Sequence, residues 1–128
     1  MKFMVIVKAT NQSEGGSPGS KEAWDAMRAF NRELIKAGIV KEGGGLAASS
    51  KGKRVHFSGS NRSITDGPFA ETKELIAGFW IWECDSMEQA MEWAKKCPNP
   101  MDGPSDIEIR EFHRVPYLPE YKTEYIAT

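Results

Sequence analysis

The sequence predicts an α+β protein of the ferredoxin-like type, in which two helices lie on one face of an antiparallel sheet. Two segments have the apolar spacing of amphipathic helices, and other segments are short and rich in β-branched or aromatic residues. Their order along the chain is strand, helix, strand, hairpin and strand, helix, strand. This order is typical of a two-layer sandwich with an inserted hairpin.

The first strand and the first helix are separated by a polar loop. Residues 2–8, "KFMVIVK", form a short apolar run typical of a buried strand. The next stretch, "ATNQSEGGSPGS", is rich in glycine and serine and predicts a loop longer than most connections. Residues 20–37 predict a helix, with Ser20 as N-cap and Gly38 as the left-handed residue that ends it.

The second half of the chain is predicted in the same way. "IVKEGGGLAAS" is a strand interrupted by glycines 43–45, which indicate a bulge or the close approach of another group. In "KRVHFSGSNRSIT" polar and apolar residues alternate before a turn at "SGSN", which predicts a hairpin. A strand over 76–84, a helix over 86–97 with "SMEQ" as capping box, and a strand "DIEIREFHRV" follow. The remainder, about 115–128, is an aromatic, proline-containing tail.

Composition bounds the possible classes of protein. The chain has 128 residues, 40% of them hydrophobic, and four tryptophans, which predicts one domain over residues 1–128 with a real core. The formal net charge is −1 without basic or acidic runs, so nucleic acid and membrane surfaces are poor partners. The opening "FMVIV" is too short for a signal-peptide core, and Cys84 and Cys97 read as reduced thiols, which predicts a cytoplasmic protein. No metal-ligand spacing, GxGxxG motif or serine elbow is present, so no metal or cofactor is expected.

Both faces of the strand over 79–84 are apolar. Phe79 and Ile81 point one way, whereas Trp80, Trp82 and Cys84 point the other. Because two helices cover only one sheet face, the tryptophans are expected on the open face, where a second copy would bury them. The sequence therefore predicts a homodimer through the open sheet face. The alternative is a monomer whose tail covers that face.

The stretch "TDGPFAETKELIAGFWIWECDSMEQAMEWAKKCPNP" resembles the signature of the DGPF proteins, a branch of the YCII-related superfamily. "MKFMVIVKA", "RELIKAG", "EGGGLAAS", "KRVHFSG" and "IEIREF" are similar to that family in order and spacing, so the resemblance covers residues 2 to about 113. It implies a ferredoxin-like fold assembled as a dimeric α/β barrel. Members of that family are mostly uncharacterised bacterial proteins, and their genes often lie beside those of extracytoplasmic-function sigma factors, so the resemblance implies the same setting for this chain.

The resemblance implies less about chemistry than about the fold. The wider superfamily includes enzymes with a histidine–aspartate pair, whose histidine lies on the first helix. In this sequence the helix over 20–37 contains no histidine, and "WDAM" at 24–27 occupies the corresponding region. The chemistry of that pair is therefore not carried over.

Asp66 is the first candidate for a reactive group. A turn aspartate usually accepts a hydrogen bond from the N–H two residues on, but Pro68 has none. The carboxylate must therefore bond to Phe69 or Ala70, or stay available to a ligand or cation. The ordinary alternative is that it caps the turn.

Other candidates accompany Asp66. Arg28 on the first helix could reach a substrate carboxylate or Asp66, and His56 on the hairpin, beside Arg54, could act as a general base. Ordinary surface charge is the alternative for both. Candidate ligand-binding residues are Glu42, Gly44, Phe69, Trp80 and Trp82.

Three functions remain open. The first is a cofactor-independent enzyme acting on a small aromatic or carbonyl-bearing molecule, with Asp66, Arg28 and His56 as its catalytic residues. The second is a non-catalytic binding or regulatory dimer linked to a sigma factor, a link that rests on the resemblance alone. The third is a dimer with a vestigial pocket.

Overall fold

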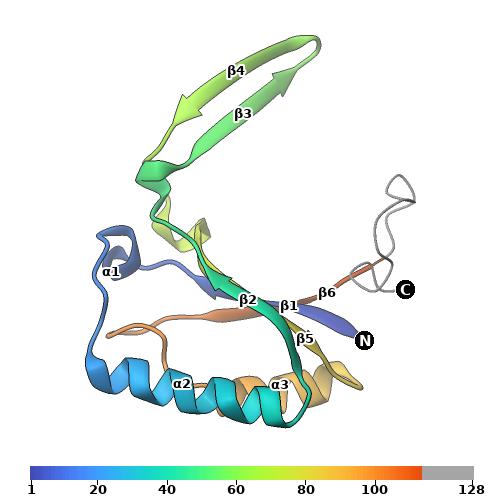
Figure 1. Cartoon of the computed structure of the whole chain (residues 1–128). Coiled ribbons are helices and arrows are strands. Elements are labelled where there is room, and N and C mark those ends of the chain that lie inside the picture. Colours follow the sequence, from blue (N-terminus) through green and yellow to red (C-terminus); the bar gives the residue numbers. More distant parts are fainter. Residues whose placement is uncertain (114–128) are drawn as a thin grey trace.

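The fold is built on a four-stranded antiparallel sheet (Figure 1). The computed structural model describes residues 1–113; the predicted tail, about 115–128, lies outside the described residues. The strands lie in the order β2 (Val40–Gly45), β5 (Ile76–Glu83), β1 (Lys2–Lys8) and β6 (Ile107–Glu111). With one helix after β1 and another after β5, this order is the predicted ferredoxin-like topology, which is confirmed.

Helices α2 (Lys21–Lys36) and α3 (Met87–Lys95) lie on the same face of the sheet (Figure 1). Each begins at a serine N-cap, because the hydroxyl groups of Ser20 and Ser86 accept the N–H groups three residues on, both at 3.1 Å. The polar loop after β1 contains a further short helix, α1 (Asn11–Glu14), which the sequence pattern does not predict. Its four residues are too few for apolar periodicity to reveal them.

The core lies between the sheet and the helices. In the antiparallel pair of β1 and β5, Phe3 is opposite Trp82 and Val5 is opposite Trp80, so the four side chains share a face. They form one buried cluster with residues of α2 such as Phe30. The prediction that Trp80 and Trp82 lie on the open face is therefore wrong. Both faces of β5 are apolar, so the alternation could not tell which one the helices cover.

Three aromatic rings form the centre of this core. The Phe30 ring meets Trp80 and Trp82 edge-on, with centroids 6.2 Å and 6.3 Å away, and the two indoles are 5.7 Å apart. Such pairs each contribute about 0.5–1.5 kcal/mol beyond the apolar area that they bury. The aromatic cluster therefore fixes how α2 lies on the sheet.

The opposite side of the sheet, here called the open face, carries Met4, Ile6, Phe79 and Ile81. Ile6 and Ile81 are buried, whereas Met4 and Phe79 are half-buried. Within residues 1–113 no helix lies on this face (Figure 1). Glu42, opposite Ile81 on β2, also lies on this side.

The predicted hairpin is confirmed and stands apart from the sheet. Strands β3 (Lys53–Ser58) and β4 (Asn61–Asp66) pair only with each other among the described strands. Every one of their residues is exposed, and the ribbon projects from the body (Figure 1). We call residues 53–66 the arm. Short 3₁₀ turns, η1 (Ser49–Lys51) and η2 (Thr72–Glu74), lie before and after it. None of the helices within residues 1–113 has the length and apolarity needed to cross a bilayer.

The two buried indoles differ in their hydrogen bonds, which allows a paired test. The Trp80 N–H donates to the Asn31 side-chain oxygen at 2.8 Å, whereas the Trp82 N–H is buried without an acceptor among residues 1–113. Trp80→Phe should therefore lower the free energy of unfolding by about 1 kcal/mol more than Trp82→Phe, because it also leaves the Asn31 oxygen unpaired. Urea unfolding at neutral pH measures both. An equal or greater loss for Trp82→Phe would contradict this assignment.

Candidate functional site

A pocket of about 740 Å³ lies on the helix side of the sheet, beside the N-terminal half of α2. Four segments surround it: the loop that includes α1, the first turns of α2, the adjoining ends of β2 and β5, and the loop between α3 and β6. Its volume is that of a typical small-molecule site. The lining residues are mostly apolar or glycine, and its polar side chains come from Gln12, Ser13, Ser17, Arg28, Asn31, Asn99 and Asp102.

One face of α2 forms a wall of this pocket. Trp24, Met27 and Asn31 follow one another at spacings of three and four residues, so they lie on one side of the helix. The Trp24 indole N–H donates to the carbonyl oxygen of Pro18, which holds the preceding loop against the helix. Trp24 nevertheless remains 53% exposed, so its ring can contact a bound molecule at the pocket entrance.

Asn31 links the pocket wall to the core. Its side-chain oxygen accepts the Trp80 N–H at 2.8 Å, and its NH₂ group donates to the Met27 carbonyl at 3.1 Å. An NH₂ group carries two hydrogens, so one donor remains for a ligand oxygen. Because both partners are fixed in the helix and the sheet, this donor is held in place before any ligand arrives.

The glycines of β2 and β5 are required for different reasons. A Cβ at Gly43 would lie 3.0 Å from the Trp80 ring, and one at Gly78 would lie 2.9 Å from the Gly44 carbonyl oxygen. Packing therefore leaves no room for a side chain at Gly43 or Gly78. A Cβ at Gly45 would meet no atom within 4 Å, although Gly45 lines the pocket. Gly45 thus leaves pocket volume open that a side chain would fill.

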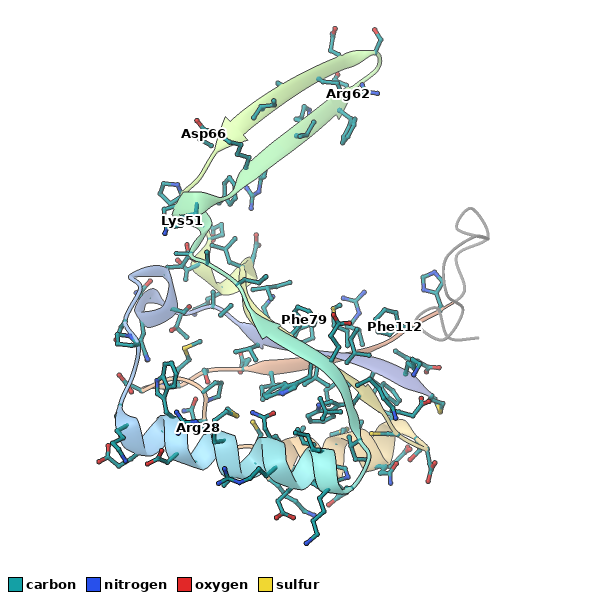
Figure 2. The ribbon with its side chains drawn as sticks, in the orientation of Figure 1. Arg28, Lys51, Arg62, Asp66, Phe79 and Phe112 are labelled. Atoms are coloured by element: carbon teal, nitrogen blue, oxygen red, sulfur yellow. The ribbon has the colours of Figure 1, made fainter. Side chains whose placement is uncertain are left out.

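The charged groups near the entrance are exposed. Arg28 on α2 (Figure 2) pairs with Asp25 at 3.3 Å, and Asp25 also pairs with Lys21 at 2.9 Å. Exposed pairs of this kind are weak and exchange readily. The guanidinium group has five N–H donors, so it can bind an anionic ligand oxygen while keeping this contact. Across the entrance, the Gln12 side-chain oxygen accepts the Asp102 N–H at 2.6 Å, joining the two loops.

The two cysteines are unsuited to nucleophilic chemistry. Burial raises the pKa of the Cys97 thiol to about 11, and burial also raises the pKa of Cys84. Both are free thiols, and a protonated thiol is a poor nucleophile. Among residues 1–113, no group of three or more His, Cys, Asp or Glu side chains is placed to hold a metal ion.

The structure separates the residues predicted to act together. Arg28, Gly44 and Trp80 line the pocket, whereas Trp82 is fully buried in the core and Glu42 lies on the open face. Asp66 (Figure 2) and His56 lie on the arm, and Phe69 lies at its base; none of the three lines the pocket. Arg62 lies opposite Phe57, on the other face of the arm from His56, with its guanidinium carbon 4.5 Å from the centroid of that ring.

Several pocket residues were not identified from the sequence. Asn31 could have been found, since it lies four residues after Met27 and seven after Trp24 on one helix face. Gly45 could not, because a run of three glycines does not show which one borders open space. Asn99 and Asp102 lie in a loop that only the tertiary fold brings to the pocket.

The "DGPF" turn joins the arm to the body. The carboxylate of Asp66 pairs with the Lys53 ammonium at 2.5 Å across the arm, and the Phe69 N–H donates to the Ser49 hydroxyl at 3.1 Å. A Cβ at Gly67 would lie 1.6 Å from the Ser49 carbonyl oxygen, so only glycine fits there. Of the alternatives for the Asp66 carboxylate, a bond from the Phe69 N–H is not formed, because that N–H donates to Ser49.

Glu14 connects this turn to α1. One carboxylate oxygen accepts the Ser49 N–H at 3.0 Å, and the other accepts the Ser49 hydroxyl. These two bonds favour the ionised form and hold the pKa of Glu14 below its ordinary value. The Arg54 guanidinium stacks on the Phe69 ring, 3.9 Å from its centroid. The base of the arm is therefore held by two contacts, one between Glu14 and Ser49 and the other between Arg54 and Phe69.

Comparison with known proteins places the chain in a family. The YCII-related domain matches residues 1–113, nearly all of the chain. The protein belongs to the YCII-related family. An uncharacterized protein of Rhizobium meliloti (strain 1021) is 29% identical over 84 residues, which cover 66% of this chain and 68% of that protein.

A solved structure supports the fold. The chain is similar to 5-chloro-2-hydroxyhydroquinone dehydrochlorinase (TftG) from Burkholderia phenoliruptrix AC1100, solved with 2,5-dihydroxybenzoquinone, with a TM-score of 0.51. The match covers 91% of this chain and 98% of that one at 14% identity. Sequence identity this low shows a common fold and no more.

The contact between Gly67 and Ser49 predicts the effect of a single methyl group. Gly67→Ala should lower the free energy of unfolding by about 1–3 kcal/mol, because the backbone of one of the two segments must move. Gly103→Ala is the matched control, since nothing lies within 4 Å of its Cβ position, and its effect should stay within about 0.5 kcal/mol. Urea unfolding measures both. Equal stability of the two variants would rule out this contact as a constraint.

The lowered pKa of Glu14 predicts a pH dependence. Its stabilising contribution is complete above the ordinary value of 4.5 and is lost as the pH falls through the lower, folded-state value. The stability difference between the wild type and Glu14→Gln should therefore be greatest at neutral pH and shrink in acid, where Glu14 is protonated and resembles glutamine. Urea unfolding between neutral pH and pH about 3 measures it. A difference independent of pH would contradict the assigned role.

Proposed function

We propose that the pocket beside α2 binds a small planar aromatic molecule that carries hydroxyl, carbonyl or carboxylate oxygens. One observation carries this proposal: a 740 Å³ pocket whose walls are mostly apolar or glycine, with two indoles, and in which Asn31 is held by two hydrogen bonds. The indoles of Trp24 and Trp80 and the glycine strip of β2 suit a flat ring. The remaining donor of Asn31 and the guanidinium of Arg28 suit its oxygens.

The structural comparison supports this class of ligand. TftG is named for its action on a chlorinated hydroxyhydroquinone and was solved with 2,5-dihydroxybenzoquinone, which is a flat, oxygen-rich ring. The two chains share a fold at low identity, so this ligand indicates a compound class to test. It does not identify the compound that this protein binds.

A catalytic role for the same pocket is part of the proposal. In a cofactor-independent reaction Arg28 would orient the ligand at the entrance, as expected from the sequence. The proposed acid–base groups Asp66 and His56 lie on the arm, so within one chain the carboxylate among the described lining residues is Asp102. Consumption of the ligand would distinguish an enzyme from a binding protein.

A homodimer through the open face accompanies this proposal. The support is now the apolar set Met4, Ile6, Phe79 and Ile81, since the tryptophans face the helices. A non-catalytic regulatory dimer linked to a sigma factor is the second candidate function, and the exposed apolar residues of the arm favour an interaction role. Membership of the DGPF branch rests on the "TDGPF" motif, and location in the cytoplasm stays a prediction.

The free space above Gly45 provides the test of binding. Gly45→Val should leave stability intact, because valine suits a strand and its Cβ would meet no atom within 4 Å, yet weaken ligand binding about tenfold by filling the pocket. Isothermal titration with 2,5-dihydroxybenzoquinone, hydroquinone and salicylate measures binding, with succinate as the non-aromatic comparison. Gly103→Val, outside the pocket, is the control.

Two results would contradict the proposal. One is the absence of binding by the wild type, with no aromatic probe reaching a Kd below about 1 mM. The other is equal affinity of the wild type and Gly45→Val, which would place the ligand elsewhere. Chromatography of each mixture after incubation shows whether the probe is consumed.

A further inference from the structure

The arm has one apolar face and one polar face. Directly opposite residues on β3 and β4 share a face, so Val55 and Ile64 lie beside Phe57 and Arg62. Val55 is 50%, Phe57 65% and Ile64 68% exposed, although each belongs to a residue type that proteins usually bury. The other face carries the polar set Arg54, His56, Ser58, Asn61, Ser63 and Thr65.

The apolar face of the arm requires a partner surface that is always available to bury it. A two-stranded hairpin alone is at best marginally stable in water, because it has no second layer to bury its apolar face. The contacts at its base involve Ser49, Gly67 and Phe69 and fix where the arm starts, but they cover none of its three apolar side chains. An occasional partner would leave these side chains in water most of the time. A second copy of the chain is such a partner, because every arm comes with one body of the same chain and the two are always present in equal amounts.

Charge also favours a second copy. The arm, residues 53–66, contains three basic residues, Lys53, Arg54 and Arg62, and a single acid, Asp66, whereas the whole chain has a formal net charge of −1. The rest of the chain is therefore acidic. The open face itself has mixed charge, because Glu108 pairs with Arg110 at 3.1 Å and Glu83 pairs with Lys2 at 3.4 Å, while Glu42 lies opposite Ile81. A basic arm and a body with an excess of acidic residues attract each other, and each copy has both.

We propose that the apolar face of the arm, formed by Val55, Phe57 and Ile64, packs against a second copy of this chain. Two-fold symmetry gives each copy the same contact, so both arms are covered at once. Arg54 and the turn at Phe69 hold the base of the arm and set its direction before association, which reduces the entropy lost on binding. This inference extends the homodimer proposed above by assigning the arm to the interface.

Photo-crosslinking tests which copy the arm contacts. Phe57 is replaced by the photoreactive benzoylphenylalanine, an aromatic side chain at an exposed position, and the purified protein is irradiated. We expect a covalent dimer on a denaturing gel, with mass spectrometry mapping the link to the second chain. The matched control places the same group at Ser63, on the polar face of the arm, where we expect at least about tenfold less dimer.

Each other outcome overturns the proposal in a distinguishable way. Sedimentation of the wild type at micromolar concentrations is measured alongside. A wild-type dimer in which position 57 links only within its own chain would reject the arm contact and leave the proposed open-face dimer standing. A wild-type monomer would reject both. Equal cross-linking from positions 57 and 63 would reject the apolar face as the contact surface.

Discussion

The indole of Trp80 lies where the hydrophobic core meets the pocket, and both depend on it. Its ring packs against Phe30 and Trp82, which holds α2 on the sheet. The same ring leaves no room for a side chain at Gly43, and its N–H fixes Asn31 in the pocket wall. A change that moves Trp80 would therefore alter the helix position, the pocket floor and the placed donor together.

The "DGPF" turn serves a different part of the molecule. It lies at the base of the arm, where Gly67 fits against Ser49 and Glu14 holds Ser49 in place. Asp66 pairs with Lys53 on the arm itself. The most distinctive motif of the sequence thus supports a projecting element, whereas the pocket is built from less distinctive residues, namely helix side chains and the glycines of β2. The most distinctive motif and the pocket therefore lie in different parts of this protein.

The sequence predicted the topology because each helix and strand carries its own local signal, such as the Ser20 cap and the apolar run over 2–8. It did not predict which face of β5 meets the helices. Alternation shows that Trp80 and Trp82 share a face, but it does not identify the face when both are apolar. The pocket was found only in part, because its loop residues come together through tertiary packing. Helical periodicity could have identified Asn31 as a pocket residue, whereas the run of three glycines does not identify Gly45.

The most direct test of the account is a titration followed through the indole N–H signals in ¹H–¹⁵N NMR spectra. The four tryptophans give four signals, and 2,5-dihydroxybenzoquinone is added stepwise. We expect saturable shifts for Trp24 and Trp80, which line the pocket, while Trp93 on α3, which does not line it, stays unchanged. Shifts confined to Trp93, or no saturable shift of Trp24 and Trp80, would show that the pocket beside α2 is not the binding site.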